Sequence, residues 1–211
     1  MNNLNQTVYV VDDDASVRRG LIRLLKSAGY SVESFDSAQA FLDADPSCQD
    51  QACLILDMKM PGMTGSHLQQ KLLERDYAVP IIFITGHGDV PMSVKAMKTG
   101  AVDFLTKPFD EGVLLGAVEE ALKKDIKTRE AIDERQSLLK KIEALTPREH
   151  EIFTYVITGM LNKQIAYTLN ISEKTVKVHR GRVMEKLSLD SVAQLVRMAS
   201  KAGIPPAEVP E

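Results

Sequence analysis

The chain has 211 residues, of which 44% are hydrophobic and 26% charged, and its formal net charge is −3. This length suits two domains that each bury a modest core. No N-terminal apolar segment has the length of a signal peptide or a membrane span, so we expect a soluble, cytoplasmic protein without a membrane partner. Cys48 and Cys53 do not form a CxxC pair, and we expect them to be reduced thiols that serve packing.

Short apolar runs in the first half of the chain each lead into a chemically active residue. The runs are Val8 to Val11, Cys53 to Leu56, Ile81 to Ile84, and Phe104 to Leu105. They are typical of buried parallel strands, whose carboxyl ends meet at one edge of an open α/β sheet. The residues that follow are, in chain order, Asp12 and Asp13, Asp57, Thr85, and Lys107. We expect their side chains to lie close together.

Helical segments alternate with these strands. Ala15 to Ala28 has an apolar stripe and stops at Gly29, while Ser37 and Thr64 are placed to cap the next two helices. A fourth helix opens at Pro91 and stops near Gly100, and a fifth starts at Glu111. Five strands alternating with five helices predict an α/β fold, a doubly wound five-stranded parallel sheet with the flavodoxin-like order.

The residue types at the predicted sheet edge suit phosphoryl chemistry. Carboxylates as crowded as Asp12, Asp13 and Asp57 would repel one another unless a hard divalent cation lay among them, and we expect that cation to be Mg²⁺. An aspartate that attacks a phosphoryl group forms an acyl phosphate, whose oxygens need counter-charge and donors. Lys107 would supply the charge and Thr85 a hydroxyl group.

A simpler interpretation treats each of these signals as structural. An Asp-Asp-Asp run before a helix is usually a helix cap, which is all we expect of Asp14, and a lone Lys-Pro is a turn. The joint occurrence of four strings at fitting intervals favours a phosphoacceptor instead. These strings are Val-Asp-Asp, Leu-Asp-Met-Lys-Met-Pro-Gly, Ile-Thr-Gly-His-Gly-Asp and Phe-Leu-Thr-Lys-Pro-Phe.

These segments resemble the receiver domain of bacterial two-component response regulators, over residues 5–122. The resemblance implies that Asp57 is the phosphoacceptor and that a sensor histidine kinase is the donor. It implies Mg²⁺ bound by Asp13, Asp57 and the backbone carbonyl of Lys59, with Asp12 completing the acidic pocket. Thr85 and Phe104 would be the switch pair and Lys107 the partner of the phosphoryl group.

The string Thr-Gly-His-Gly-Asp-Val-Pro-Met at 85–92 resembles the FixJ branch of that family. In this branch the face made by the fourth helix and fifth strand dimerises on phosphorylation. The matching positions here are Val94, Lys98 and Asp103.

From Glu111 the helical pattern continues without Gly or Pro through the charged stretch after Lys123. Opposite charges recur near i,i+4 spacing, so we expect residues 123–143 to be a helical linker. An inter-subunit coiled coil is an alternative, although its apolar positions, Ile126, Ile132, Leu139 and Ile142, are irregularly spaced.

A second domain begins at a capping box, Thr146 to Glu149, with Pro147 at the first helical position. Gly159 ends that helix, and we expect Asn162 to cap a short second one. A tight turn at residues 170–172 leads into a third helix, Glu173 to Leu187, which is strongly basic. Two short helices joined by such a turn are typical of a helix-turn-helix, although a plain bundle with a solvated basic face has the same pattern.

The strings Leu-Thr-Pro-Arg-Glu, Asn-Lys-Gln-Ile-Ala and Ser-Glu-Lys-Thr-Val-Lys-Val-His-Arg resemble the LuxR/GerE-type DNA-binding domain, over residues 144–203. The resemblance implies that Lys177 and Val178 contact base edges of a double-stranded DNA operator. Thr175, Arg180 and Arg182 would hold phosphates, and His179 would only occupy a helix face. A fourth helix, Ser191 to Ala202, would pair two subunits, and residues 204–211 would be a disordered tail.

One residue departs from that pattern. Gly181 stands one turn after Lys177, where relatives can carry a further base-contacting side chain. Glycine inside a helix costs about 1 kcal/mol relative to alanine. It is therefore either tolerated because packing dominates or retained for a close approach of the backbone.

Together these features predict a phosphorylation-dependent transcription regulator, not an enzyme. Phosphorylation of Asp57 would drive dimerisation and operator binding, and the protein would act with RNA polymerase as an activator. One alternative is a Mg²⁺-dependent phosphatase or phosphotransferase, but no Asp-x-Asp nucleophile pair follows a strand. Another is a DNA-binding protein whose receiver no longer takes phosphate, which the intact set from Asp12 to Lys107 disfavours.

Overall fold

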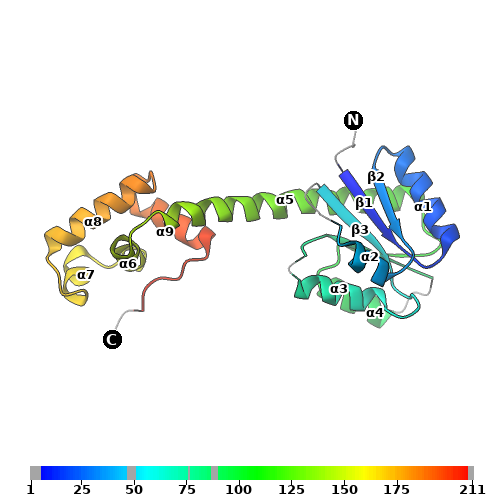
Figure 1. Ribbon diagram of the computed structural model, residues 1–211, viewed down its shortest axis with the longest axis horizontal. Coiled ribbons are helices and arrows are strands. Elements are labelled where there is room, and N and C mark those ends of the chain that lie inside the picture. The colour runs from blue at the N-terminus through cyan, green and yellow to red at the C-terminus, as the bar shows by residue number, and fades with distance from the viewer. Residues whose placement is uncertain (1–5, 47–50, 76, 87–89, 209–211) are drawn as a thin grey trace. The chain divides into compact units, whose positions relative to one another are not determined.

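The computed structural model describes residues 6–46, 51–75, 77–86 and 90–208 (Figure 1). The chain forms two compact units, Met1–Arg129 and Glu130–Glu211. Cys48, residues 87–89 of the FixJ-like string and residues 209–211 of the expected tail lie outside the described residues. Cys53 is fully buried as a free thiol, and burial raises its pKa, which suits a packing role.

The N-terminal unit is built on one parallel sheet with the strand order β2-β1-β3-β4-β5. This order confirms the predicted doubly wound, flavodoxin-like topology. In chain order the elements are β1 (Gln6–Val11), α1 (Ala15–Ser27), β2 (Ser31–Phe35), α2 (Ala38–Ala44), β3 (Gln51–Asp57), α3 (Gly65–Glu74), β4 (Ile81–Thr85), α4 (Val90–Lys98), β5 (Asp103–Thr106) and α5 (Glu111–Glu143).

Helices cover both faces of this sheet and divide its core in two (Figure 1). On one face the strands pack against α2, α3 and α4 through residues such as Phe41, Leu68 and Ala96. On the other face they pack against α1 and α5 through residues such as Leu25 and Val118. Because both faces are covered, the central strands β1, β3 and β4 carry continuous apolar runs, as the sequence predicted.

Side chains cap the helices where the sequence predicted. Asp14 accepts hydrogen bonds from the backbone N–H groups of Ser16 and Val17, which confirms its role as the cap of α1. Ser37 and Thr64 cap α2 and α3 in the same way. Helix α1 ends one residue before the predicted Ala28, and α4 begins one residue before Pro91. Both differences lie within the fraying of helix ends.

Helix α5 is one unbroken helix of 33 residues, so the expected linker segment is helical. A buried carboxylate, that of Asp125, joins this helix to the sheet of the N-terminal unit. Asp125 Oδ2 accepts hydrogen bonds from the backbone N–H of Ala52, at 3.0 Å, and from Arg129 Nε, at 2.6 Å. The side chain of Asp125 is fully buried, and it ties the helix to the start of β3.

The C-terminal unit contains α6 (Pro147–Val156), α7 (Asn162–Thr168), α8 (Glu173–Lys186) and α9 (Val192–Ala202) around a single core. Ile142 of α5 is buried in this core and Leu139 is partly buried against it, so Ile142 is not available to an inter-subunit coiled coil. The expectation that Asn162 caps α7 is wrong. Leu161 is the residue before the helix, and the side chain of Asn162 instead accepts a hydrogen bond from Arg180.

An ion pair between the buried Glu149 and the exposed Lys186 joins the start of α6 to the end of α8. The capping box is present, since Thr146 Oγ1 accepts from the N–H of Glu149 and Glu149 Oε2 accepts from the N–H of Thr146. The same Glu149 oxygen lies 2.6 Å from Lys186 Nζ. The hydrogen bond from Lys186, followed by that from Thr146, lowers the pKa of the Glu149 carboxyl from its ordinary value of 4.5 to about 2.

We predict that Glu149→Gln lowers the thermal stability of the C-terminal unit at pH 7. Because the pKa of Glu149 is depressed in the folded state, the ionised form adds stability that is complete above its unfolded value of 4.5 and is lost as the pH falls toward about 2. The stability difference between variant and wild type should therefore narrow over this range. Thermal melts of the full chain at a series of pH values measure it. Glu151→Gln, at an exposed pair, is the control; a difference independent of pH would contradict the assignment.

Candidate functional site

A lysine joins two acidic residues at the carboxyl edge of the sheet. Asp12 follows β1, Asp57 ends β3 and Lys107 follows β5. Lys107 Nζ lies 2.6 Å from Asp12 Oδ2 and 2.8 Å from Asp57 Oδ1. Because β1 and β3 are neighbours in the sheet, their carboxyl ends place the two carboxylates side by side. The structure therefore brings together three residues that are up to 95 positions apart in the chain.

Both carboxylates are held rigidly. Asp12 is fully buried and Asp57 is only 5% exposed. The second oxygen of each accepts a backbone hydrogen bond of 2.8 Å, from Asp14 N–H to Asp12 Oδ1 and from Lys59 N–H to Asp57 Oδ2. Each of the four carboxylate oxygens thus has a donor, and the orientation of both groups is set before any ligand arrives.

Burial and the lysine act on Asp57 in opposite directions. Burial raises the pKa of the Asp57 carboxyl, and the hydrogen bond and charge of Lys107 oppose that rise. For Lys107, partial burial lowers the pKa, but the hydrogen bonds to Asp12 and Asp57 outweigh it and the pKa is raised overall. Lys107 therefore stays cationic beside a carboxylate that is poorly solvated, a combination suited to a nucleophile that receives an anionic group.

Thr85 and Phe104 lie on neighbouring strands next to this cluster. Thr85 is buried at the end of β4, one residue beyond Ile84, the register partner of Asp57. Its carbonyl oxygen accepts a hydrogen bond of 2.7 Å from the N–H of Lys107. Phe104, on β5, is partly buried against the core on the α4 side of the sheet. A movement of Thr85 would therefore displace Lys107, which is hydrogen-bonded to it, and β5, the neighbouring strand that contains Phe104.

The donor set fits Mg²⁺, an ion that takes one or two carboxylates and completes its shell with waters and phosphate oxygens. Asp57 would supply a hard oxygen ligand with the buried Asp12 beside it, and Asp13 and Lys59 are exposed at the same edge. Within the described part of the chain, no three Asp, Glu, His or Cys side chains converge into a complete metal cage. The expected crowding of three carboxylates therefore reduces to two, bridged by Lys107, with Asp13 at the solvent side.

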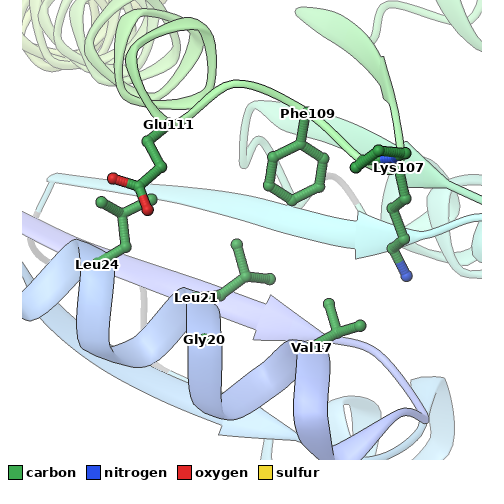
Figure 2. A pocket seen from close by; sticks show the side chains of 8 residues that line it. Val17, Gly20, Leu21, Leu24, Lys107, Phe109 and Glu111 are labelled. Carbon is green, nitrogen blue, oxygen red and sulfur yellow. The ribbon is translucent and has the colours of Figure 1, made fainter.

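An apolar pocket of about 540 Å³ opens beside Lys107, between α1 and the segment that joins β5 to α5. Figure 2 shows Val17, Leu21 and Leu24 on α1 facing Phe109 across it. The lining residues are Val17, Gly20, Leu21, Leu24, Lys107, Pro108, Phe109 and Glu111. One side of the acidic edge is thus bordered by an apolar surface with the cation of Lys107 at its end.

Sequence reasoning missed Gly65, which positions Asp57. A Cβ atom at Gly65 would lie 2.4 Å from the backbone oxygen of Asp57, closer than any side chain is tolerated. Its N–H also donates to the carbonyl of Met58. Only glycine lets α3 start this close to the end of β3. The Met-Thr-Gly sequence shortly after Asp57 was the available signal, but a glycine before a helix has many ordinary explanations.

The three residues expected at a dimer interface lie on or next to α4. Val94 is 48% exposed and Lys98 is exposed, both on α4. Asp103, at the start of β5, is partly buried, and its Oδ1 accepts from the N–H of Phe104. Met97, which sequence reasoning did not single out, adds a second exposed apolar side chain to the helix.

Helix α8 presents most of the expected DNA contacts to solvent. Lys177 and Arg182 are exposed, and Val178 is 45% exposed. Thr175 is partly buried, with its hydroxyl 2.8 Å from that of Ser172, the residue that caps the helix. Arg180 points to α7 instead, where it donates to Asn162 Oδ1 at 2.9 Å. The structure thus gives Arg180 a role in joining the two helices of the helix-turn-helix.

A sheet of this order with an Asp–Lys cluster at its carboxyl edge, followed in the same chain by a helix-turn-helix unit, defines the class of two-component response regulators. The comparisons agree. Residues 8–119 match the family model described as "Response regulator receiver domain", and residues 143–199 match "Bacterial regulatory proteins, luxR family". The chain belongs to the response regulators with a LuxR-type DNA-binding domain, and within them to the FixJ type.

Similar proteins cover almost the whole chain. The "Response regulator protein TmoT" of Ectopseudomonas mendocina is 47% identical over 95% of this chain and 91% of its own length. The "Transcriptional regulatory protein FixJ" of Azorhizobium caulinodans is 43% identical over 95% of each chain. A solved structure of "Response Regulator StyR" is 48% identical, with a TM-score of 0.76 over 93% of this chain and 99% of its own.

The chain is therefore a transcription regulator of a two-component system, with a sensor kinase and DNA as its partners. In the described part of the chain, no helix is long and apolar enough to cross a membrane.

Proposed function

We propose that Asp57 accepts a phosphoryl group from a sensor histidine kinase and that this modification makes the chain dimerise and bind an operator. The observation that carries the proposal is the contact of Lys107 Nζ with both Asp12 and Asp57. In the transfer step, an Asp57 oxygen attacks phosphorus, a new P–O bond forms, and the bond from phosphorus to the imidazole nitrogen of the donor breaks.

Lys107 has two functions in this proposal. Before transfer it offsets the charges of two buried carboxylates, which would otherwise repel each other. After transfer it lies within reach of the new phosphoryl oxygens, because it already touches the carboxylate oxygen beside them. The donors to bound Mg²⁺ would be Asp13, Asp57 and the Lys59 carbonyl, with Asp12 in support, and the ion would neutralise phosphoryl oxygens.

We predict that acetyl phosphate with Mg²⁺ adds one phosphoryl group to the wild type and none to Asp57→Asn. An amide cannot act as the carboxylate nucleophile. Full-length mass spectrometry after incubation measures the label. Asp133→Asn, at an exposed aspartate of α5, is the matched control and should label normally. Equal labelling of wild type and Asp57→Asn would rule out the assignment.

The signal would pass from Asp57 through Thr85 to the α4 face. A phosphoryl group on Asp57 attracts the hydroxyl group of Thr85, whose strand position is one residue beyond the register partner of Asp57. The space that this hydroxyl vacates would let Phe104, on the neighbouring strand, turn inward. The surface formed by α4 and β5, with Val94, Lys98 and Asp103, would change and become competent to pair.

We predict that Val94→Asp leaves labelling of Asp57 intact and blocks the shift from monomer to dimer. Val94 is a half-exposed apolar side chain on α4, so a charge there would have to be buried in the interface. Sedimentation of labelled and unlabelled protein measures the shift. Leu73→Asp is the matched control, because Leu73 is a similarly exposed apolar residue on α3. Unchanged dimerisation of Val94→Asp would refute this face while leaving the phosphoacceptor untouched.

Dimerisation would place two copies of α8 at two half-sites in the major groove. Lys177 and Val178 are exposed on the helix and would reach base edges. Arg182 and Thr175 would hold phosphates, whereas Arg180 would do so only in addition to its bond with Asn162. We further propose that the bound dimer contacts RNA polymerase and activates transcription. The test is a transcription reaction reconstituted on the bound promoter. A decrease of transcripts on phosphorylation would show that the protein is a repressor there.

We predict different losses of DNA affinity for two basic residues of α8. Lys177→Ala should cost about 1 to 3 kcal/mol on a specific site and relax the sequence preference there. Arg182→Ala should weaken specific and scrambled DNA alike and lower the salt slope by about 1. Binding isotherms of the phosphorylated protein over a salt series measure both effects. Identical salt slopes and specificity ratios for the two variants would show that the register of the recognition helix is wrong.

A further inference from the structure

Helix α8 contains a glycine where a helix former would be more stable. The helix runs from Glu173 to Lys186, and Gly181 lies in its interior on an exposed surface. Glycine loses more backbone freedom on folding than any other residue and shields none of the helical backbone from water. Gly181 is therefore less favourable for the stability of α8 than alanine would be at the same position.

Neither packing nor backbone conformation within the C-terminal unit requires glycine at position 181. A Cβ atom built at Gly181 meets nothing within 4 Å, in contrast to Gly65, where the Cβ would meet the Asp57 backbone at 2.4 Å. Gly181 also lacks the positive φ that makes glycine favourable at Gly203, which ends α9 with φ +74°. The fold of the C-terminal unit would therefore accept alanine at position 181.

Helical periodicity places Gly181 on the side of α8 that faces away from the core. Positions 174, 177, 178 and 181 follow one another at spacings of three or four residues and form one stripe. All of them are exposed, and they are Lys174, Lys177, Val178 and Gly181. The buried residues Val176, Val183 and Leu187 occupy the opposite side of the helix. Gly181 therefore shares its surface with the proposed base contacts Lys177 and Val178.

We propose that Gly181 is a specificity-determining residue, at which the backbone of α8 lies directly against base edges in the major groove. This inference rests on the proposed DNA-reading role of α8. With hydrogen in place of a side chain, the helix sits deeper in the groove, and Lys177 and Val178 reach their bases at contact distance. A methyl group at position 181 pushes the helix outward and lengthens both contacts. Phosphate contacts at the rim, made by long flexible side chains, adapt to the displacement.

Gly181→Ala tests the proposal, with Gly116→Ala as its matched control. Gly116 is also an exposed glycine inside a helix, α5, and a Cβ there likewise meets nothing within 4 Å. The probe is a duplex selected from a random-sequence library by the phosphorylated wild-type chain, compared with a scrambled duplex of the same composition. Melting temperature and both affinities are measured on full-length, phosphorylated proteins.

We expect both variants to melt at higher temperature than wild type, because alanine replaces glycine inside a helix. Only Gly181→Ala should bind the selected duplex more weakly, by about tenfold, the size of one lost base contact. Its affinity for scrambled DNA should change less than about twofold, since phosphate contacts dominate there. A second variant, Gly181→Leu, should lose more specific affinity than Gly181→Ala because its side chain is larger.

Three results would overturn the proposal. Unchanged affinity of Gly181→Ala and Gly181→Leu for the selected duplex would show that nothing approaches position 181. Equal losses on selected and scrambled DNA would place a phosphate, or another partner, at this position. A lower melting temperature of Gly181→Ala would show that the fold itself requires glycine. A wild-type chain that selects no sequence at all would instead refute the DNA-reading role of α8, and the inference with it.

Discussion

The contact of Lys107 with Asp12 and Asp57 is the constraint on which the N-terminal unit depends. Two buried carboxylates on adjacent strands repel each other, and a single ammonium group 2.6 and 2.8 Å from them offsets both charges. The strand order serves this contact, because it places β1 and β3 side by side and brings the end of β5 within reach of them. A phosphoryl group on Asp57 would change the charge at the one point where these strands are joined. In the proposed function, this local modification would alter the α4 and β5 surface.

In the C-terminal unit, too, a lysine offsets the charge of a buried carboxylate, and here the ion pair joins two helices. Glu149 is buried, yet it accepts hydrogen bonds from Thr146 N–H and Lys186 Nζ, so its charge is satisfied. The pair joins the first turn of α6 to the last turn of α8 and holds the proposed recognition helix against the rest of the unit. Arg180 and Asn162 join α8 to α7. These contacts on the inner and lateral surfaces of α8 set the orientation of the helix. The residues on its outer surface are not needed for that purpose, so they can serve the proposed DNA contact.

A buried aspartate and two glycines also bear on how the helices are positioned. Asp125 ties α5 to the start of β3, at the end of that strand opposite Asp57. Gly65 lets α3 begin against the Asp57 backbone, whereas Gly181 has open space around it. These two glycines look alike in the sequence, but they differ in what a side chain would meet. The fold therefore requires glycine at position 65 and does not require it at position 181.

The parallel sheet and the helix-turn-helix could be predicted from the sequence, because apolar runs, cap residues and spacing are local signals that report directly on local structure. The placement of Asp57, Thr85 and Lys107 at one edge could also be predicted, since residues at the ends of parallel strands share that edge. The sequence did not predict that Lys107 bridges Asp12 and Asp57, that Asp13 is exposed, or that Arg180 donates to Asn162. The partners of the buried Asp125 and Glu149, and the empty space around Gly181, likewise became visible only in the folded structure. These features depend on distances between residues far apart in the chain, and the packing of whole elements sets such distances.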